Sequence, residues 1–443
     1  MGFSSTSPTH RLPRSTTVVV IGAGQAGLAM SRCLTDRSID HVVLDRGDVA
    51  QSWRTERWDS LRLLTPNWMT RLPGFQYSGA DPDGYMTAAE VSAFLDAFRR
   101  SFDAPIVTNT EVQLVTASDT GYSVVTNQGS ICSKAVVIAT GACSTPRIPA
   151  ISTELPSHIE QIAPIDYRNP AQIADGGVLV VGASASGAQL ADELQRSGRD
   201  VTIAVGDHVR VPRTYRGMDI HWWMNELGTL DERFDEVEDI SRGRRLPSLQ
   251  LIGTPEQRDL DMNTLQAAGV QTVGRLVGVA NGSAQFSGSF ANMCASADLK
   301  QGRLLDAIDE HARRHGLDRE IGDAERPAPT AVGSPSNTID LAAYRTVIWA
   351  TGFRPNYPWL DPSMLDARGA ISHDGGVMDA PGMYVLGLPF ERRRKSSFLD
   401  GVGPDAIDLS THLRSYLDSV ATPAGRRPRP LRGLDEVTAP SRR

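Results

Sequence analysis

The chain has 443 residues, of which 40% are hydrophobic and 22% charged, a composition typical of a globular protein of two or three domains. Its formal net charge of −7 argues against a general affinity for nucleic acid or anionic lipid. The N-terminus lacks the apolar core of a secretory signal, and no apolar run reaches the roughly 20 residues that span a bilayer. The four cysteines form no CxxC pair, so we expect neither a metal site nor a redox-active disulfide, and a cytoplasmic location.

A strand, a glycine-rich turn and a helix are predicted in VVVIGAGQAGLAMSRCL, residues 18–34. Residues 18–21 are all β-branched, as expected of a parallel strand that is buried on both faces. The glycines that follow match GxGxxG at Gly22, Gly24 and Gly27. The first glycine permits the tight turn, the second lets a pyrophosphate approach, and the third lets helix and strand pack closely. The helix N-terminus offers the phosphates free N–H groups and a positive dipole end.

The next strand, HVVLD, ends in Asp45, 23 residues after Gly22. A carboxylate at this place accepts hydrogen bonds from ribose hydroxyls. The glycines alone are also compatible with a plain tight turn. Strand, turn, helix and Asp45 together predict a dinucleotide site that suits FAD.

Two further patterns follow along the chain. Thr87, with Glu90 three residues later, forms a capping-box pattern and predicts a helix over TAAEVSAFLDAFRRSF. KAVVIATGA, residues 134–142, predicts a buried strand that ends in a glycine turn. The bend TPRIPA then leads into a second cycle of strand, helix and strand.

The second cycle begins with VLVVGASASGAQLADEL, residues 178–194, in which Gly182, Ser184 and Gly187 take the places of the three glycines. Serine is small, so the close approach of a pyrophosphate is only modestly impaired. The second strand of this cycle ends at Gly206, where a ribose-binding carboxylate would stand, and Arg210 and Arg213 follow. A missing carboxylate with arginines nearby suits a ribose that carries a 2′-phosphate, as in NADPH.

Alternatives remain open for this second site. Asp207 could be the ribose ligand, which would suit NADH, and either arginine could be a surface charge. With NADPH in the second unit and FAD in the first, the chain holds two different dinucleotides. The absence of a cysteine pair implies that electrons leave the flavin for something other than a disulfide.

The remaining sequence carries fewer signals. Between Arg213 and about Gly333 it is polar and hard to assign, except for a helix predicted in LLDAIDEHARRHG and closed by Gly316. TVIWATGFRPN repeats the earlier strand that ends in ATG, GMYVLGL predicts a further strand, and DAIDLSTHLRSYL a closing helix. The chain therefore repeats one large unit rather than a short motif.

Several of these segments resemble the flavin-containing monooxygenases, a family that includes the plant auxin-forming enzymes. The resemblance runs from about Thr17 to Leu413. It is carried by GAGQAGL, by QSWR at residues 51–54, by WDSLRLLTP at 58–66, by GASASG, and by ATGACSTPRIP and ATGFRPN, which resemble the two linkers between domains.

The resemblance implies an α/β fold with two Rossmann-like dinucleotide-binding domains, for FAD and NADPH, the second inserted in the first as in the glutathione-reductase and monooxygenase type. The expected boundaries are a disordered N-terminus at 1–15, a discontinuous FAD domain at 16–163 and 335–420, an NADPH domain at 164–334, and a tail at 421–443.

The resemblance also implies site residues. Those expected at the cofactors are Gly22, Gly24, Gln25, Ala26, Gly27, Asp45, Arg46, Trp53, Arg54, Leu61, Thr140, Gly141, Gly182, Ser184, Ser186, Gly187, Arg210, Arg213, Ala350, Thr351, Gly352 and Asp405. Leu64, Asn67 and Trp222 are the expected residues of a pocket beside the flavin. HWWM, residues 221–224, could line that pocket or could be core packing.

The chain departs from the family pattern at two places. In the family fingerprint FxGxxxHxxxF/Y, Tyr167 aligns with the last aromatic but Ala163 takes the histidine position, which weakens a Baeyer–Villiger assignment. Many members place an asparagine beside the flavin, where this chain has Leu64, with Asn67 three residues later. Either one hydrogen bond near the flavin is missing or Leu64 serves to keep water out.

The reaction implied by the resemblance is monooxygenation. NADPH reduces FAD, dioxygen forms a hydroperoxyflavin, and one oxygen atom passes to a small organic substrate at nitrogen or sulfur. The alternatives are a Baeyer–Villiger monooxygenase, an NADPH oxidase or flavin reductase without an oxygenated product, and a nucleotide-binding redox sensor or scaffold. The expected partners are a small-molecule substrate and dioxygen, without nucleic acid or membrane, and a homodimer is an open alternative to a monomer.

Overall fold

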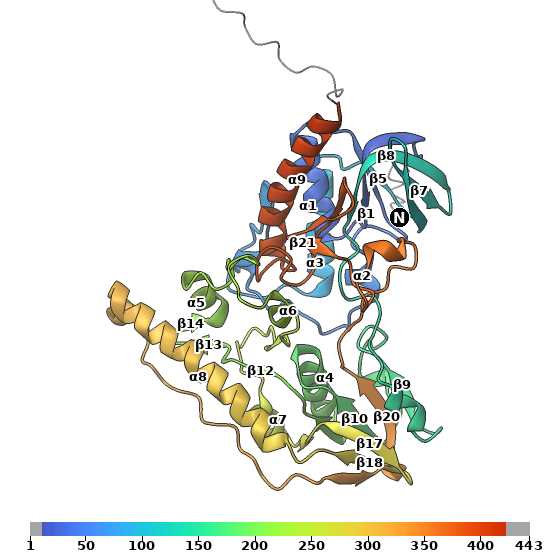
Figure 1. The fold of residues 1–443 in the computed structure, drawn as a ribbon. Helices are drawn as coiled ribbons and strands as arrows, with labels where there is room; N and C mark the ends of the chain where they lie inside the picture. Colours follow the sequence, from blue (N-terminus) through green and yellow to red (C-terminus); the bar gives the residue numbers. More distant parts are fainter. Residues whose placement is uncertain (1–10, 422–443) are drawn as a thin grey trace, which may run out of the picture.

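The computed structural model of the protein describes residues 11–421 (Figure 1). The expected N-terminal lead-in and the basic C-terminal tail lie outside this range, except for residues 11–15 and Ala421. The described chain forms two lobes, each built on its own sheet (Figure 1). No helix of the described residues combines the length and the apolar character needed to cross a membrane.

The first sheet lies in the upper lobe of Figure 1, and its central strands are parallel. Its main path runs in the order β21 (His373–Asp374), β22 (Val377–Met378), β23 (Met383–Val385), β8 (Gly129–Ile138), β1 (Ser15–Ile21), β2 (His41–Leu44) and β5 (Ile106–Val107). An antiparallel extension adds β7 (Gly121–Thr126) beside β8, and β6 (Val112–Ser118) beside β7. We call this sheet and the helices packed on it the first unit.

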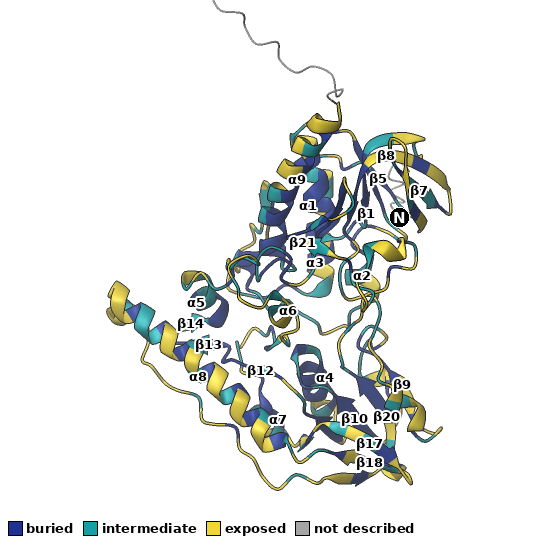
Figure 2. Cartoon of the chain, in the orientation of Figure 1, coloured by how far each residue is buried: buried dark blue, intermediate teal, exposed yellow. Residues whose placement is uncertain are grey.

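Three helices cover the first sheet: α1 (Gln25–Asp36), α3 (Ala88–Arg100) and α9 (Leu399–Ala421). The strand predicted at residues 18–21 is confirmed, and those four residues are buried, as Figure 2 shows for β1. The predicted capping box is also confirmed: Thr87 Oγ1 accepts from the Glu90 N–H, and the Glu90 carboxylate accepts from the Thr87 N–H. Burial of apolar strand and helix faces against each other holds this unit together.

The second sheet lies in the lower lobe and is entirely parallel. Its order is β16 (Gln271–Val273), β11 (Val201–Ala204), β10 (Gly177–Val181), β20 (Tyr344–Trp349) and β9 (Glu160–Ile162). Helices α4 (Ala185–Arg196) and α7 (Met262–Ala267) contribute to its core, and β17 (Leu276–Ala280), β18 (Ser283–Phe286) and β19 (Thr338–Asp340) form a small antiparallel sheet. We call this part the second unit.

The second sheet extends beyond the expected range of 164–334 at both ends, because β9 and β20 are strands within it. The position of β20 in this sheet repeats the arrangement of the first unit. There the strand that precedes the first ATG, β8, is parallel to β1, and β20 stands in the same relation to β10. The α/β fold with the second unit inserted in the first is confirmed.

Residues 205–335 carry short elements and one long helix. The helix, α8 (Phe290–His315), ends at Gly316, as predicted, but begins well before Leu304. The short elements are β12 (Val209–Arg210), β13 (Thr214–Tyr215), β14 (Met218–Asp219), α5 (Ile220–Glu226), α6 (Ile240–Gly243) and β15 (Leu249–Gln250). Helix α8 packs against α5 through a cluster that includes Tyr215, Trp223 and Ile308.

Two crossings connect the units, and they pair with each other. The Arg147 N–H donates to the Gly352 carbonyl at 2.9 Å, and the Arg354 N–H donates to the Thr145 carbonyl at 2.9 Å. Both segments directly follow an ATG sequence. The two linkers that the sequence predicts therefore lie side by side.

Candidate functional site

The first glycine turn has the geometry of a dinucleotide cradle. Gly22 has φ +109°, and a Cβ there would stand 2.5 Å from the Ala139 carbonyl oxygen. A Cβ on Gly27 would stand 1.8 Å from the Gly22 carbonyl oxygen, so the helix lies directly against the turn. Gly24 differs, because its φ is −82° and an added Cβ would meet no atom within 4 Å. The space in front of Gly24 is where the motif expects a pyrophosphate.

Asp45 is held at the mouth of this turn. Its carboxylate accepts from the Ala23 N–H at 2.6 Å and from the Gly47 N–H at 2.9 Å. Burial raises the pKa of Asp45, and these two backbone bonds oppose the rise. Each carboxylate oxygen accepts only one of these bonds, so lone pairs remain for ribose hydroxyls.

The other residues expected at the first site lie around this turn with varied roles. Gln25 ties it to the loop before α9, because its Nε2 donates to the Ser397 carbonyl at 2.7 Å. Arg54 Nε donates to Ser92 Oγ at 2.8 Å, and Trp53 lies under the Arg57 guanidinium at 5.2 Å. Ala26 is buried, and the side chain of Arg46 is 65% exposed and pairs with Glu56 at 3.4 Å.

The second turn repeats the first closely. Gly182 also has φ +109°, and a Cβ there would stand 2.3 Å from the Ala350 carbonyl oxygen. A Cβ on Gly187 would stand 1.9 Å from the Gly182 carbonyl oxygen. Ser184 takes the place of Gly24 with φ −78°, its side chain makes no capping bond to the helix, and Ser186 is half-buried. The serine therefore keeps the backbone path of the turn.

The ATG segments end at these turns. Ala139 and Ala350 supply the carbonyls against which Gly22 and Gly182 pack. Thr140 and Gly141, which follow Ala139, are exposed and half-buried, respectively. In the second linker Thr351 Oγ1 donates to the Arg147 carbonyl, and Gly352 accepts the Arg147 N–H. These residues thus form the edges of the two turns and the start of the two paired linkers.

The end of β11 differs from the end of β2. In the strand register the counterpart of Asp45 is Val205 rather than Gly206, because the Gly22 N–H donates to the Leu44 carbonyl and the Gly182 N–H to the Ala204 carbonyl. Gly206 follows Val205, and a Cβ on it would be 3.5 Å from the Arg275 guanidinium. Arg275 Nη2 lies 3.0 Å from Asp207 Oδ2, and the two side chains are 54% and 66% exposed. This exposed ion pair therefore lies beside the end of β11.

The two arginines expected at this site point into the protein instead. Arg210 is 3% exposed and pairs with Asp261 at 2.6 Å and with Asp298 at 2.7 Å. Burial opposes its charge, but the hydrogen bonds with Asp298 and Asp261 raise the pKa of Arg210. Arg213 is fully buried and pairs with Asp219. Breaking a buried ion pair is expensive, so neither Arg210 nor Arg213 is free to reach a ligand at the surface.

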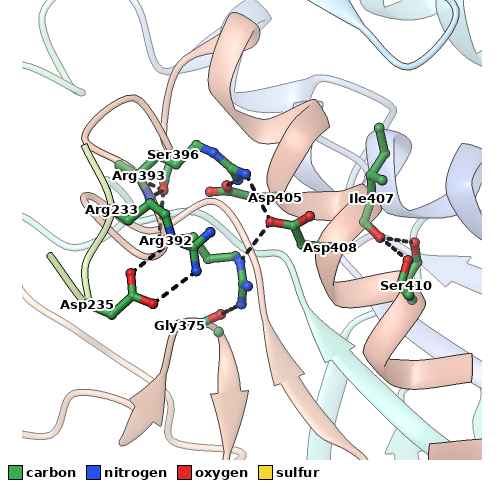
Figure 3. Close-up of polar contacts among 12 residues, drawn as sticks. Arg233, Asp235, Gly375, Arg392, Arg393, Ser396, Asp405, Ile407, Asp408 and Ser410 are labelled. Atoms are coloured by element: carbon green, nitrogen blue, oxygen red, sulfur yellow. Dashed lines mark hydrogen bonds and ion pairs between the residues drawn. The ribbon is translucent and has the colours of Figure 1, made fainter. Parts of the chain in front are cut away.

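Asp405 also lies deeper than expected. It is fully buried at the start of α9, and Arg393 Nη1 lies 2.5 Å from it while Arg393 Nη2 bonds Asp408 at 3.0 Å (Figure 3). Burial raises the pKa of Asp405, and its hydrogen bonds with Ser396 and Arg393 oppose the rise. Asp405 therefore anchors the loop before α9 and holds that loop in place beside Gln25.

The three residues expected beside the flavin are not equivalent. The Asn67 side chain is buried and spans two backbone groups, donating to the Asp81 carbonyl at 2.9 Å and accepting from the Met86 N–H at 2.9 Å. Leu64 and Trp222 are half-buried and pack on the same apolar cluster around Tyr215 and Trp223. The structure brings Leu64 and Trp222 to one cluster and gives the Asn67 amide a structural role.

Other expected positions lie between the units. Leu61 packs against the core of the second unit, as does Trp58 from the same segment. The fingerprint residues Ala163 and Tyr167 are buried, and Tyr167 belongs to that same core. The segment around residues 58–64 therefore forms a contact between the two units.

Sequence reasoning missed Arg275, and no local signal could have found it. It lies 68 residues from Asp207, just past β16, and only the parallel pairing of β16 with β11 brings the two together. It also missed two contacts between distant segments: the Tyr85 hydroxyl donates to Asp219, 134 residues away, and the Phe398 ring meets the His221 ring. All four cysteines lie in the described part of the chain, and each is a free thiol.

Comparisons with known proteins agree with this geometry. Residues 19–230 match the family described as pyridine nucleotide-disulphide oxidoreductase. The CzcO-like oxidoreductase of Geobacillus kaustophilus is 33% identical over 90% of this chain and 98% of its own length. The probable indole-3-pyruvate monooxygenase YUCCA10 of Arabidopsis thaliana is 30% identical over 45% of this chain and 53% of its own length.

A solved structure shares the fold. The flavin-containing monooxygenase from Stenotrophomonas maltophilia aligns with a TM-score of 0.64 and 21% identity, over 91% of this chain and all of that one. The overall fold of this chain is thus a known one.

Proposed function

The chain belongs to the family of flavin-containing monooxygenases and CzcO-like oxidoreductases, and from this premise we propose that it binds FAD in the first unit and NADPH in the second and oxygenates a small organic substrate. It is a flavoprotein oxidoreductase of the monooxygenase type. The specific cofactors and the kind of oxygenation are the parts that we propose.

One observation carries the proposal: two turns of the same geometry are followed by strands with different ends. Asp45 closes the first site with a carboxylate suited to the free ribose hydroxyls of FAD. Val205 leaves the second site without a carboxylate on the strand, and the next residue, Gly206, lies beside the exposed Arg275. Two sites that differ in this way suit two different dinucleotides.

We assign the 2′-phosphate of NADPH to Arg275. Its present partner, Asp207, is exposed, and such surface pairs contribute only about 0–1 kcal/mol. A phosphate offers a doubly charged partner to the same guanidinium, and charge-assisted bonds of that kind are the stronger ones. The competing arrangement, in which Asp207 accepts from a ribose hydroxyl, would instead favour NADH.

When bound, the flavin supplies the redox chemistry, and the overall reaction consumes NADPH, a proton, dioxygen and substrate and yields NADP⁺, water and the oxygenated substrate. The chain's residues bind, orient and exclude water. Gly24 and the N-terminus of α1 receive the pyrophosphate of FAD. Leu64 and Trp222, packed on one apolar cluster, provide a dry wall for the pocket.

The proposed substrate class rests on the absence of acid–base groups from the side chains of Leu64 and Trp222. Leu64 and Trp222 carry no acid–base group, so the pocket suits a soft nucleophile at nitrogen or sulfur, which needs no proton transfer from the protein. A carbonyl substrate is the second candidate, because relatives named for indole-3-pyruvate act on a keto acid. Ala163, buried where the fingerprint has histidine, gives no support to a Baeyer–Villiger reaction.

The experiment supplies the flavin-loaded protein with NADPH, ¹⁸O-labelled dioxygen and a panel of probes: methyl phenyl sulfide, trimethylamine, indole-3-pyruvate and phenylacetone. We expect one labelled oxygen atom in the product of at least one nitrogen or sulfur probe, with less peroxide released per NADPH. Peroxide equal to NADPH with every probe, and no labelled product, would instead establish an NADPH oxidase.

A further inference from the structure

A fully buried arginine lies at the interface of the two units. Arg213 has no exposed surface. Its Nη1 donates to the Leu64 carbonyl at 2.9 Å, and its Nη2 lies 2.8 Å from Asp219 Oδ1 and 3.0 Å from His221 Nδ1. Its guanidinium also stacks over the Tyr85 ring at 4.8 Å. None of these contacts is with a surface group.

The contacts of Arg213 cross from one unit to the other. Arg213, Asp219 and His221 lie between β11 and β16 of the second sheet, before β13, in β14 and in α5, respectively, and we count this segment with the second unit. Leu64 and Tyr85 lie between β2 and β5 of the first sheet, and their neighbours Leu63 and Met86 pack in the core of the first unit. Tyr85 adds a second connection, because its hydroxyl donates to Asp219 Oδ2 at 2.7 Å. The segment that carries Leu64 is therefore held to the second unit through polar bonds as well as packing.

A second arm reaches the loop before α9. The His221 ring meets the Phe398 ring edge-on, with centroids 6.3 Å apart and planes at 73°. Phe398 directly follows Ser397, whose carbonyl accepts from Gln25 at the first glycine turn. The buried arginine and histidine thus join the second unit to two segments of the first unit: the one that carries Leu64 and the one that reaches the FAD cradle.

The charges in this cluster are fixed. Burial alone would raise the pKa of Asp219, but its hydrogen bond with His221 and the Arg213 cation outweigh burial and hold that pKa at about 2. Burial, together with the same cation, lowers the pKa of His221, although Asp219 opposes this. The cluster is therefore an arginine–aspartate ion pair with a neutral histidine near pH 7.

The arrangement is not what stability alone favours. Replacing a buried ion pair with apolar side chains of similar volume is often neutral or stabilising. Arg213 Nε, moreover, is a buried donor with no hydrogen-bond partner among the described residues, and such a donor costs about 1–3 kcal/mol. The presence of this incompletely bonded arginine between the two units therefore points to a role in positioning the segments that it joins.

We infer that Arg213 is a positioning residue for oxygenation: it fixes the Leu64 segment against the second unit and so keeps the pocket wall closed to water. This inference rests on the proposed function. Its physical basis is the bond to the Leu64 carbonyl, which sets the distance of the backbone at Leu64 from the unit proposed to carry the nicotinamide. Without it, water could enter between the units, and the two electrons from NADPH would reduce dioxygen to hydrogen peroxide rather than yield an oxygenated product and water.

The test compares Arg213→Met, which keeps the aliphatic stem and removes the donors, with Arg213→Lys, which keeps the charge and loses the planar fork. Arg216→Met is the matched control. Arg216 lies three residues on, its side chain is 9% exposed, and it pairs with Asp309 and Asp318 within the second unit. All variants are prepared with flavin bound.

Two readouts are measured in each protein: the ratio of peroxide released to oxygenated product, with the probe that the unmodified protein oxygenates, and hydrogen exchange of backbone amides in residues 58–66. We expect Arg213→Met to raise the ratio of peroxide to oxygenated product by about tenfold, as loss of a hydrogen bond to a charged group predicts, and to speed exchange in 58–66. Arg213→Lys should restore part of both. Arg216→Met should match the unmodified protein in both.

The outcomes separate the inference from the function. Unchanged exchange and an unchanged ratio of peroxide to oxygenated product in Arg213→Met overturn the positioning role, even if the unmodified protein oxygenates a probe. A wild-type protein without any oxygenated product overturns the function, while the exchange measurement still reports on the bond to Leu64. If Arg213→Met does not fold, Tyr85→Phe removes only the hydroxyl bond to Asp219 and should shift both readouts the same way; no shift would contradict the inference.

Discussion

The Gly22 carbonyl oxygen lies 1.8 Å from the place where a Cβ on Gly27 would stand, and the same relation holds between Gly182 and Gly187 at 1.9 Å. In both units the helix is thus pressed against the turn that precedes it. Gly24 stands apart from these positions, because nothing in the protein lies near a side chain added there. Gly22, Gly27, Gly182 and Gly187 are therefore required by the packing of the fold, whereas Gly24 leaves room for a ligand.

We therefore predict opposite effects at two glycines of the first turn. Gly24→Val should fold normally, because its φ of −82° suits any residue, but should lose its FAD, because the side chain fills the space for the pyrophosphate. Gly27→Ala should lose about 3 kcal/mol or more of stability through overpacking. Flavin absorbance per protein measures the FAD content of each variant. The unfolding free energy of the flavin-free proteins measures the stability of each. Stoichiometric FAD on Gly24→Val would remove the basis for the first site.

Preference for NADPH should depend on Arg275. A charge-assisted hydrogen bond to phosphate is worth about 1.5–3 kcal/mol, so Arg275→Ala should lose roughly tenfold to a hundredfold in kcat/KM for NADPH and change little with NADH. Arg275→Lys should retain part of the preference. The readout is the ratio of kcat/KM for the two cofactors. An unaltered ratio in Arg275→Ala would show that another residue binds the 2′-phosphate.

Stability should depend on pH through a buried glutamate near Asp405. Glu391 is fully buried, and burial raises the pKa of Glu391 well above its ordinary value of 4.5; the Asp405 charge adds to the rise, and the Leu388 N–H and Arg392 oppose it. The folded protein thus keeps this proton to higher pH than the unfolded chain. The contribution of Glu391 to stability is complete below pH 4.5 and is lost as pH rises toward the folded pKa.

Glu391→Gln mimics the protonated acid and has no proton to lose. Relative to the unmodified protein it should gain up to about 1.4 kcal/mol of unfolding free energy per pH unit between pH 4.5 and the folded pKa. Urea unfolding at pH 5 and pH 8 measures the difference. The exposed Glu160→Gln serves as control and should show a constant difference. A constant difference in Glu391→Gln as well would contradict the buried proton.

Leu64→Asn tests the two accounts of the missing asparagine. Because the Leu64 side chain packs on the apolar cluster with Tyr215 and Trp223, we expect an amide there to admit water and to raise the ratio of peroxide to oxygenated product about twofold to tenfold. Leu64→Met, which conserves the volume, should leave the ratio near that of the unmodified protein. A lower ratio in Leu64→Asn would show instead that the chain lacks a useful hydrogen bond.

The sequence is most informative where structure is local. The two glycine turns, the buried strands and the Thr87–Glu90 cap each depend on residues a few positions apart, and the structure has all of them. The start of α8 was missed because its buried face is made of small or polar residues, such as Cys294, Ala297 and Gln301, which give no apolar period. The end at Gly316 was found because it depends on one residue in the left-handed region, with φ +68°.

The site was harder to predict where it depends on pairing between distant segments. Arg210 and Arg213 are close in sequence to the end of β11, but acidic residues from α7, α8 and the loop before α5 draw them inward. Arg275 reaches the same end of the sheet from the neighbouring strand. Proximity along the chain could suggest an arginine there but could not choose which one.

The most direct test of the monooxygenase assignment mixes the protein, fully reduced by NADPH without oxygen, with dioxygen in a stopped-flow spectrophotometer. The account predicts a species that absorbs to the blue of oxidised flavin, persists for seconds while NADP⁺ is bound, and decays faster when a sulfide such as methyl phenyl sulfide is added. A direct return to the spectrum of oxidised flavin, with one peroxide released per NADPH and no effect of the sulfide, would contradict it.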